Sequence, residues 1–453
     1  MQNLWLILHS LIVMSGLAIY VVTTHTLHLR RHPSAAISWV ASLILLPYIA
    51  LPLYLMFGIR KVGYCRKTVK GRELPASDTN TLSHRTRQLA AVMALPEASS
   101  YQQLSIHENG DEALQALRYM IANAARTIDL CTFIFAHDSV GREISRSLML
   151  RVQQGIRVRL LVDGVGAYLG GHTDFKSLSD AGVQVTFFVP PLRSSTRGRI
   201  NLRNHRKMVI IDNTWLWCGG RNLATEYFES DTPWIDLSFD LRGALALQAQ
   251  QQFEQDWAFA IGAGKPVLSQ STAAGPVIGQ LIASGPDQMD DTYYTLLISG
   301  FFNARKRVMA VTPYFVPDPT LLMSLTLAAR RGVVVDLLLP KKSNHRLADF
   351  ARHRALRELT AAGAHVWFLP DMIHAKTVVI DDEIAFAGSA NLDQRSLFLN
   401  YEMMIAFYEA TDVKRFSKWI EHHMNAAAPY HARPPGIGLE VAEGLLLWLA
   451  FQL

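Results

Sequence analysis

Two segments of the 453-residue chain carry the same reactive side chains at the same spacing. His205 is followed by Lys207 and Asp212 in the first segment, and the second repeats this spacing with His374, Lys376 and Asp381. Both are followed by a glycine, a small residue and an asparagine, namely Gly219, Gly220 and Asn222, then Gly388, Ser389 and Asn391. Histidines can attack or move protons, and lysines and asparagines can stabilise negative charge, so each segment suits chemistry at an anionic group.

The residues around each segment predict how these side chains are held. Apolar runs at 208–211 and 377–380 predict buried strands, and residues two apart share one face of a strand, so each histidine should project beside its lysine. Each aspartate has the opposite parity and falls at a turn, so we expect it to hold the hairpin. The glycine-rich stretch that follows predicts close backbone approach and the start of a helix that suits an anion. The predicted phosphate-binding residues are Gly220, Asn222, Ser389 and Asn391.

The duplication separates these segments from ordinary core histidines. A buried histidine with satisfied hydrogen bonds is the common alternative for either copy alone, and one match to such a short pattern is weak. Two copies with the same residues behind them argue against coincidence. We therefore interpret both histidines as catalytic candidates.

Together the two segments resemble the phospholipase D superfamily, which is defined by paired His-Lys-Asp motifs. Residues 219–227, 312–317 and 391–402 are more closely similar to the bacterial-type cardiolipin synthases, and the resemblance covers nearly the whole chain. It implies a phosphatidyltransferase that makes cardiolipin from phosphatidylglycerol and releases glycerol. It further implies a covalent phosphatidyl-histidine on His205, with His374 as acid and base. The symmetry of the sequence does not itself decide between the two histidines.

The residues alone reach only a phosphodiester transfer through a covalent histidine at a membrane. Lys207 and Lys376 carry charge that metals would otherwise supply, so we expect neither metal nor cofactor. A nucleophilic histidine needs an acceptor for its second nitrogen, and Glu402 in the second half and Asp236 in the first are the candidates. A carboxylate at a sheet edge is the alternative for both. Arg221 and Arg395 could bind headgroup phosphate or be solvated surface charges.

An internal repeat predicts an α/β fold of two pseudo-symmetric halves with mixed sheets flanked by helices, at 104–262 and 263–430. Segments 124–135, 154–163 and 181–188 correspond to 304–315, 331–340 and 362–369, each an alternation of helix ends and strands. Packing two such units face to face would bring the motifs together. The stretch 260–284, rich in Gly, Ala, Ser and Pro, is interpreted as a linker.

The N-terminus predicts a transmembrane hairpin at 1–58, with spans at 4–23 and 35–57. A cleaved signal peptide is the alternative, but no Lys or Arg precedes the first run and a second run follows at once. Two arginines lie between the runs, and six basic residues within 60–72 follow them, so we expect the catalytic body on the cytoplasmic side of a bacterial inner membrane. A basic tether is predicted at 59–103. The apolar segment 431–453 suits a membrane-surface helix or a helix packed on the core.

Composition fits this interpretation without specifying it. Half of the residues are hydrophobic, and 44 Lys and Arg against 38 Asp and Glu suit anionic lipid or nucleic acid equally. Cys65, Cys131 and Cys218 show no paired spacing, and the last two lie in strand-like runs, which predicts buried thiols.

Three other functions remain open from the sequence. They are a phospholipase D that hydrolyses lipid, a nuclease of the same superfamily, and an inactive membrane scaffold. The membrane spans favour lipid, so phospholipids and the bilayer are the expected partners and nucleic acid is not. Intact histidines and lysines argue against the scaffold. The second lipid substrate and the oligomeric state stay undetermined.

Overall fold

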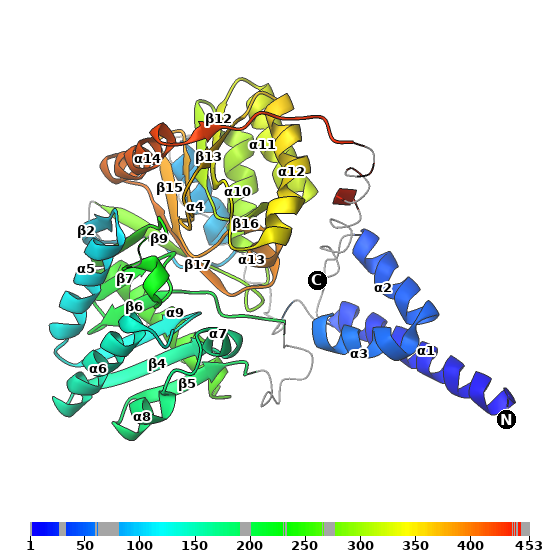
Figure 1. Ribbon diagram of the computed structural model, residues 1–453, viewed down its shortest axis with the longest axis horizontal. Helices are drawn as coiled ribbons and strands as arrows, with labels where there is room; N and C mark the ends of the chain where they lie inside the picture. Colours follow the sequence, from blue (N-terminus) through cyan, green and yellow to red (C-terminus); the bar gives the residue numbers. More distant parts are fainter. Residues whose placement is uncertain are drawn as a thin grey trace.

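The computed structural model describes residues 2–26, 33–58, 61, 81–190, 201–229, 231, 233–264, 266, 277–436, 438, 440 and 443–444. Cys65 and much of the predicted tether and of the apolar C-terminal segment lie outside these residues. Figure 1 shows a body of two α/β halves, one above the other, with the N-terminal helices projecting from one side.

The first half contains a seven-stranded sheet in which the parallel strands β3, β4 and β5 continue into antiparallel ones. The strands are β2 (Gln102–His107), β3 (Thr127–Thr132), β4 (Arg157–Asp163), β5 (Gln184–Phe188), β6 (Met208–Ile211), β7 (Trp215–Gly219) and β8 (Ser238–Arg242). Their spatial order is β2-β8-β7-β6-β3-β4-β5. Helices α5 (Gly110–Ala122) and α6 (Ser139–Gln153) cover one face, and α9 (Ala244–Ala260) covers the other.

The second half repeats this order as β9-β17-β15-β14-β10-β12-β13, with a short strand added at each end. These strands are β9 (Ile278–Ser284), β10 (Arg307–Val311), β12 (Val334–Pro340), β13 (His365–Leu369), β14 (Thr377–Ile380), β15 (Ile384–Gly388), β17 (Glu402–Phe407) and the added β1 (Ser99–Ser100) and β18 (Ala428–Pro429). Helices α10 (Thr292–Asn303), α11 (Pro319–Arg330) and α12 (Arg346–Ala361) cover one face, and α14 (Ala410–Asn425) covers the other. The predicted pair of α/β halves is confirmed.

The two halves share one apolar core. It contains Phe253 of α9 and Phe239 of β8 together with Phe407 of β17 and Phe416 of α14. The ring of Phe239 contacts those of Phe407 and Phe416, at centroid distances of 5.3 and 6.3 Å. Because the faces that carry α9 and α14 are packed together, the motif strands of both halves are brought to a common interface.

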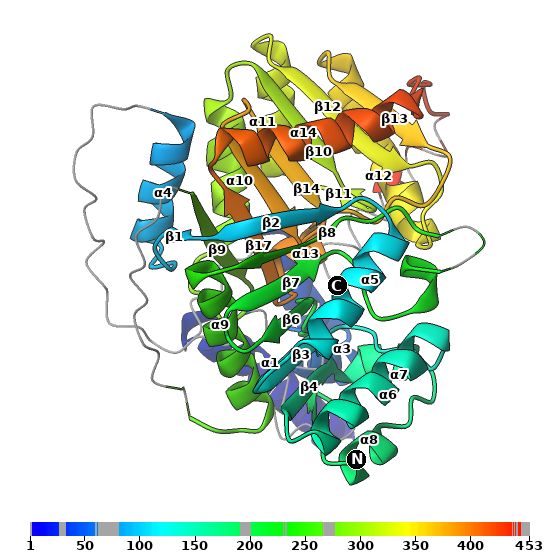
Figure 2. The ribbon, with the colours of Figure 1, turned by 90° about the vertical axis from the view of Figure 1, so that its left-hand side faces the viewer.

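Part of the stretch predicted as a tether belongs to the body. Strand β1 pairs with β9 of the second half, and β2, two residues later, pairs with β8 of the first. Figure 2 shows β2 lying between the halves. Between these strands Tyr101 is buried and its hydroxyl donates to Asp412 at 2.6 Å. The chain therefore joins the edges of both sheets before it enters the first half.

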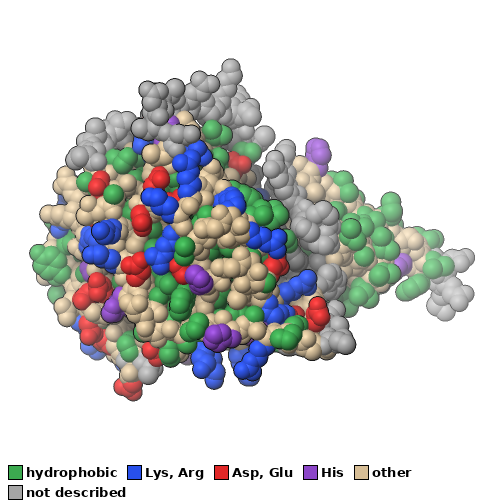
Figure 3. Space-filling model, turned by 90° about the horizontal axis from the view of Figure 1, so that it is seen from above, with side chains coloured by type: hydrophobic (Ala, Val, Ile, Leu, Met, Phe, Trp, Pro, Cys, Tyr) green, Lys and Arg blue, Asp and Glu red, His purple; other side chains and the backbone are tan. Residues whose placement is uncertain are grey.

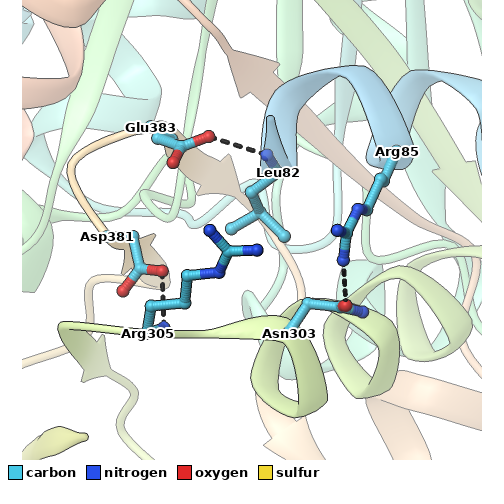
Figure 4. A pocket seen from close by; sticks show the side chains of 6 residues that line it. All are labelled: Leu82, Arg85, Asn303, Arg305, Asp381 and Glu383. Carbon is cyan, nitrogen blue, oxygen red and sulfur yellow. Dashed lines mark hydrogen bonds between the residues drawn. The ribbon is translucent and has the colours of Figure 1, made fainter. Parts of the chain in front are cut away.

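Helix α4 (Leu82–Val92) attaches the same stretch to the second half. The backbone N–H of Leu82 donates to Glu383 at 2.7 Å, and Arg85 donates to Asn303 at 2.5 Å. A cavity of about 20 Å³ remains beneath the helix, with Arg305 directed between these contacts in Figure 4. Such a volume accommodates about one water molecule. It lies beyond Asp381, at the end of β14 opposite to His374.

The predicted linker is shorter than expected. Residues 278–284 form β9, which pairs with β17 along six residues, and Leu281 and Ile282 are buried. The small and polar residues Gly279, Gln280 and Ala283 concealed this strand in the sequence. Position 279 has little room for a side chain, because a Cβ on Gly279 would lie 2.9 Å from Leu245 Cδ2.

The N-terminal helices differ from the predicted hairpin of two spans. Leu4–His25, within α1 (Gln2–Thr26), is the one stretch of the described chain that is long and apolar enough to cross a bilayer. The second predicted span is divided into α2 (Pro33–Leu45) and α3 (Pro47–Phe57), because the residue before a proline avoids helical geometry. Apolar side chains cover these projecting helices, whereas the body carries mixed charges (Figure 3).

Contacts show that α3 lies beside α1 and parallel to it. Tyr48, at the start of α3, bonds His9 at 3.3 Å, and Tyr54, near its end, bonds Thr23 at 2.5 Å. Helices α1 and α3 therefore run in the same direction, and α3 returns toward the body (Figure 1).

Candidate active site

Each motif begins in a segment that crosses to the other half. The backbone N–H of His205 donates to Tyr401 at 2.9 Å, and that of His374 donates to Ile235 at 2.6 Å. Parallel bridges pair Asn204 with Tyr401 and Ile235 with Ile373. The residue before each candidate carboxylate thus bonds the histidine of the opposite motif, which gives the site its approximate two-fold symmetry.

The carboxylates follow the same crossing. His205 Nδ1 lies 2.9 and 3.1 Å from the two oxygens of Glu402, and His374 Nδ1 lies 2.7 Å from Asp236 Oδ2. Both carboxylates are fully buried. The sequence located one candidate carboxylate in each half without assigning it to a histidine, and the structure pairs each with the other half's histidine.

These contacts determine the charge states. Burial alone would raise the pKa of Asp236, but Lys376 and His374 lower it to about 2, and His205 likewise outweighs burial to lower the pKa of Glu402. Burial lowers the pKa of His205, and burial together with Lys376 lowers that of His374 to about 3. A neutral imidazole beside an ionised carboxylate donates its Nδ1 proton, which leaves the Nε2 lone pair available.

The lysines lie beside their histidines, as the spacing predicted, but both pairs precede the strands instead of lying on them. Lys207 Nζ donates to the carbonyl of His205 at 2.8 Å, and Lys376 Nζ lies 2.7 and 3.1 Å from the ring nitrogens of His374. Burial lowers the pKa of Lys207 to about 8 and that of Lys376 to about 7. Within the described part of the chain, no three His, Cys, Asp or Glu side chains are grouped as metal ligands.

The motif aspartates hold backbone at the far ends of the strands. Asp212 accepts the N–H groups of residues 125–127 at 2.7–2.8 Å, and Asp381 accepts those of residues 305–307 at 2.6–2.9 Å. Both have left-handed backbones, with φ of 53° and 54°. Neither is placed to touch a ligand at the histidines.

The predicted phosphate-binding residues are placed in different ways. Asn222 accepts from the N–H of Ile134 at 3.2 Å and donates to the hydroxyl of Tyr227 at 2.8 Å. Asn391 Oδ1 is buried without a hydrogen-bond partner among the described residues. Ser389 donates to Glu402. A Cβ on Gly220 would lie 2.2 Å from Asp236 Oδ1, so both small residues position the orienting carboxylates.

The helices predicted behind the motifs are present only as short helical turns. The turns there are η1 (Thr225–Tyr227), of three residues, and α13 (Gln394–Phe398), of five. Asp393 caps α13 by accepting the N–H of Ser396 at 2.8 Å. A short helix with an aspartate at its N-cap already has a partner for its free N–H group, so we assign no phosphate to it.

The two candidate arginines are held by the protein. Arg221 is buried, and its Nε donates to the carbonyl of Tyr227 at 3.2 Å. Arg395 donates twice to Asn201, at 3.0 Å each. Arg221 is therefore not a solvated surface charge.

Aromatic residues that the sequence did not identify cover the two histidines unequally. Tyr227, Trp234 and Tyr314 surround His374, with centroid distances of 5.1, 5.5 and 6.5 Å. His205 contacts Phe133 at 5.2 Å. The side chain of His205 is 13% exposed and that of His374 only 4%. In the sequence, the additional residues at 227–232 of the first half could have indicated these aromatic side chains.

Cys131 and Cys218 are buried free thiols beneath the site, as predicted. The Sγ of Cys131 donates to the carbonyl of Arg206 at 3.6 Å. Burial raises the pKa of both thiols, so they are packed as protonated, apolar groups.

Comparisons with known proteins agree with this architecture. Residues 117–257 and 297–424 match the family model described as cardiolipin synthase, PLD-like domain, and residues 13–58 match the phospholipase D-nuclease N-terminal model. The chain is 31% identical to cardiolipin synthase A of Pseudomonas fluorescens SBW25, over 88% of this chain and 87% of the relative. It is also 31% identical to cardiolipin synthase 2 of Bacillus anthracis, over 89% of this chain and 83% of the relative.

A solved structure supports the fold alone. Phosphatidylserine synthase of Haemophilus influenzae Rd KW20 superposes with a TM-score of 0.62 at 16% identity, covering 81% of this chain and 96% of that one. The family models cover more than half of the chain, and the relatives match along most of their length. The chain therefore belongs to the cardiolipin synthase family of the phospholipase D superfamily, and it is an enzyme of that family.

Proposed function

We propose that the protein joins two molecules of phosphatidylglycerol into cardiolipin and releases glycerol, through a phosphatidyl group held covalently on His205. The observation that carries the proposal is the crossed arrangement of His205 with Glu402 and His374 with Asp236. Each pair leaves one imidazole nitrogen for chemistry, and a buried lysine accompanies each. The relatives' names support cardiolipin as the product, and phosphatidylglycerol as the substrate follows from the resemblance to that family and not from the geometry.

In the first step, Nε2 of His205 attacks the phosphorus of one lipid, and the bond to the glycerol oxygen breaks. His374 gives that oxygen a proton, so glycerol leaves as a neutral alcohol. Burial and the neighbouring Lys376 keep His374 neutral, and an entering phosphodiester anion favours its protonated form. The greater exposure of His205 favours it as the nucleophile.

In the second step, His374 takes the proton of a hydroxyl on the second lipid. The resulting oxygen attacks phosphorus, the bond between phosphorus and His205 breaks, and cardiolipin leaves. Lys207 and Lys376 stabilise the charge on the phosphoryl oxygens in both steps. We therefore expect activity to survive EDTA, and complete loss that magnesium restores would contradict the metal-free mechanism.

Mass spectrometry of lipids tests the reaction itself. Purified protein would be incubated with vesicles of phosphatidylglycerol, with the His205→Ala variant as control. Cardiolipin and equimolar free glycerol are expected from the unaltered protein alone. Phosphatidic acid as the main product would indicate a hydrolase instead.

We propose that α1 anchors the enzyme and that the body lies on the cytoplasmic side, as the basic residues at 60–72 indicate. The sequence predicts that the chain crosses the membrane twice, whereas the parallel arrangement of α1 and α3 favours a single crossing by α1. A protease-sensitive tag at the N-terminus distinguishes them. Two crossings place the tag on the side of the body, and one crossing places it opposite.

A further inference from the structure

A basic loop at residues 341–346 consists of the connection from β12 to α12 and the first residue of that helix. It contains Lys341, Lys342, His345 and Arg346, all exposed. Among the described residues, no carboxylate forms an ion pair with any of these four side chains. The equivalent segment of the first half is α7 (Gly164–Leu169), which carries no charged residue. Of the two corresponding strands, β12 is followed directly by positively charged side chains and β4 is not.

The side chain of Tyr314 joins the loop to the wall of the candidate site. The hydroxyl of Tyr314 donates to Asn344 Oδ1, and its ring lies 5.1 Å from that of His345. The ring of Tyr314 also lies 6.5 Å from the ring of His374, which is a candidate catalytic residue. A single tyrosine therefore separates the basic loop from the proposed acid and base.

The second step of the proposed reaction brings a further negative charge to the site, which a cation would stabilise. Its acceptor is an alcohol that is itself anionic, since three carbons and an ester oxygen join its hydroxyl to a second phosphodiester. That linkage is comparable in length with a tyrosine side chain beyond its Cβ. When the hydroxyl lies at His374 and the linkage extends along the side chain of Tyr314, the acceptor phosphate reaches the basic loop. Lys207 and Lys376 are already engaged with the phosphoryl group on His205.

We propose that loop 341–346 binds the phosphodiester of the acceptor lipid, so that the enzyme selects an anionic lipid over water or a small alcohol in the second step. The inference rests on the proposed function. The hydroxyl proton passes to His374, the new oxygen–phosphorus bond forms, and the bond from phosphorus to His205 breaks, while the loop holds the second phosphate in place.

Two reactions of the same enzyme separate this role from others. Cardiolipin formation uses the anionic acceptor, whereas exchange of labelled free glycerol into phosphatidylglycerol uses the same donor and intermediate with a neutral acceptor. The variant Lys341→Ala/Lys342→Ala should lower cardiolipin formation by about tenfold or more and leave glycerol exchange within about twofold. Lys341→Arg/Lys342→Arg, which keeps both charges, should retain cardiolipin formation.

A matched control removes two exposed lysines elsewhere. Lys414→Ala/Lys418→Ala takes the same charge from α14, which lies on the side of the body away from α12 (Figure 1). It should alter neither reaction. The outcome that overturns the proposal is an equal fall of both reactions in the loop variant, which would mean that the loop only docks the body on the anionic bilayer. Unchanged cardiolipin formation would overturn it too. Absence of both reactions from the unaltered enzyme would instead refute the proposed function, and this inference with it.

Discussion

His205 Nδ1 lies 2.9 Å from Glu402 Oε1, although Glu402 belongs to the other half of the chain. The reciprocal contact joins His374 to Asp236. Neither half therefore contains both a motif histidine and the carboxylate that orients it. A half expressed alone would present a histidine without its acceptor and a buried carboxylate without its partner.

Glu402→Gln and Asp236→Asn should damage different steps. Each substitution replaces the carboxylate that fixes a histidine tautomer by a neutral amide, which can also donate to the ring nitrogen, so each should lower turnover roughly 10²- to 10⁴-fold. Glu402→Gln should slow covalent labelling at His205, and Asp236→Asn should slow proton transfer by His374. Asp240→Asn is the control, because Asp240 bonds His107 at 2.9 Å within one half. If Glu402→Gln instead spared labelling and impaired proton transfer, the crossed assignment would be wrong.

The sequence predicted the components of the site more successfully than their connections. Spacing identified His205 and His374, and the strand after each motif led to Glu402 and Asp236. Periodicity describes one segment at a time, however, and the crossing depends on how two sheets pack. The aromatic residues around His374 were not predicted for the same reason, since Tyr314 comes from a different half than Tyr227 and Trp234. The position of α3 beside α1 depends on the break in the helix before Pro47, which the hydrophobicity pattern does not predict.

The pH dependence should reflect the buried lysines. Their pKa values are about 8 for Lys207 and about 7 for Lys376, and loss of either proton removes charge from the phosphate site. We expect kcat/KM to fall as pH rises through this range, and kcat to fall at higher pH, because a bound phosphodiester raises both pKa values. On the acid side, the lowered pKa of His205 should keep the nucleophile neutral to a lower pH than an ordinary histidine would allow. Lys→Arg variants should lose the alkaline fall, since arginine stays charged, and its persistence in both would contradict this assignment.

Asp212→Ala and Asp381→Ala should reduce stability and spare the chemistry. Each loses three charge-assisted hydrogen bonds to backbone N–H groups and places alanine at a left-handed backbone, for an expected cost of about 2–4 kcal/mol in unfolding free energy. Asparagine tolerates that conformation and should cost less. Denaturant unfolding measures the loss, and kcat per folded molecule should be nearly unchanged. A hundredfold fall in kcat of a folded variant would instead assign the aspartate a part in the reaction.

Gly220→Ala should impair His374 through Asp236. The added methyl would lie 2.2 Å from Asp236 Oδ1, so the carboxylate must move away from the imidazole. We expect turnover to fall with little change in substrate KM. Gly264→Ala, where a Cβ meets nothing within 4 Å, is the matched control. Unaltered turnover in folded Gly220→Ala would show that the position of Asp236 does not limit the reaction.

The division of labour between the histidines can be tested with a phosphatidyl analogue that carries a nitrophenol leaving group. Nitrophenol leaves without a proton, so it does not need the acid that glycerol requires. His374→Ala should therefore still acquire covalent phosphatidyl label from this analogue. It should release that label slowly, because nothing deprotonates the acceptor alcohol. His205→Ala lacks the attacking nitrogen and should acquire none, and intact-protein mass spectrometry would measure both. Label on His205→Ala with none on His374→Ala would mean that the more enclosed histidine, beneath Tyr227 and Trp234, is the nucleophile.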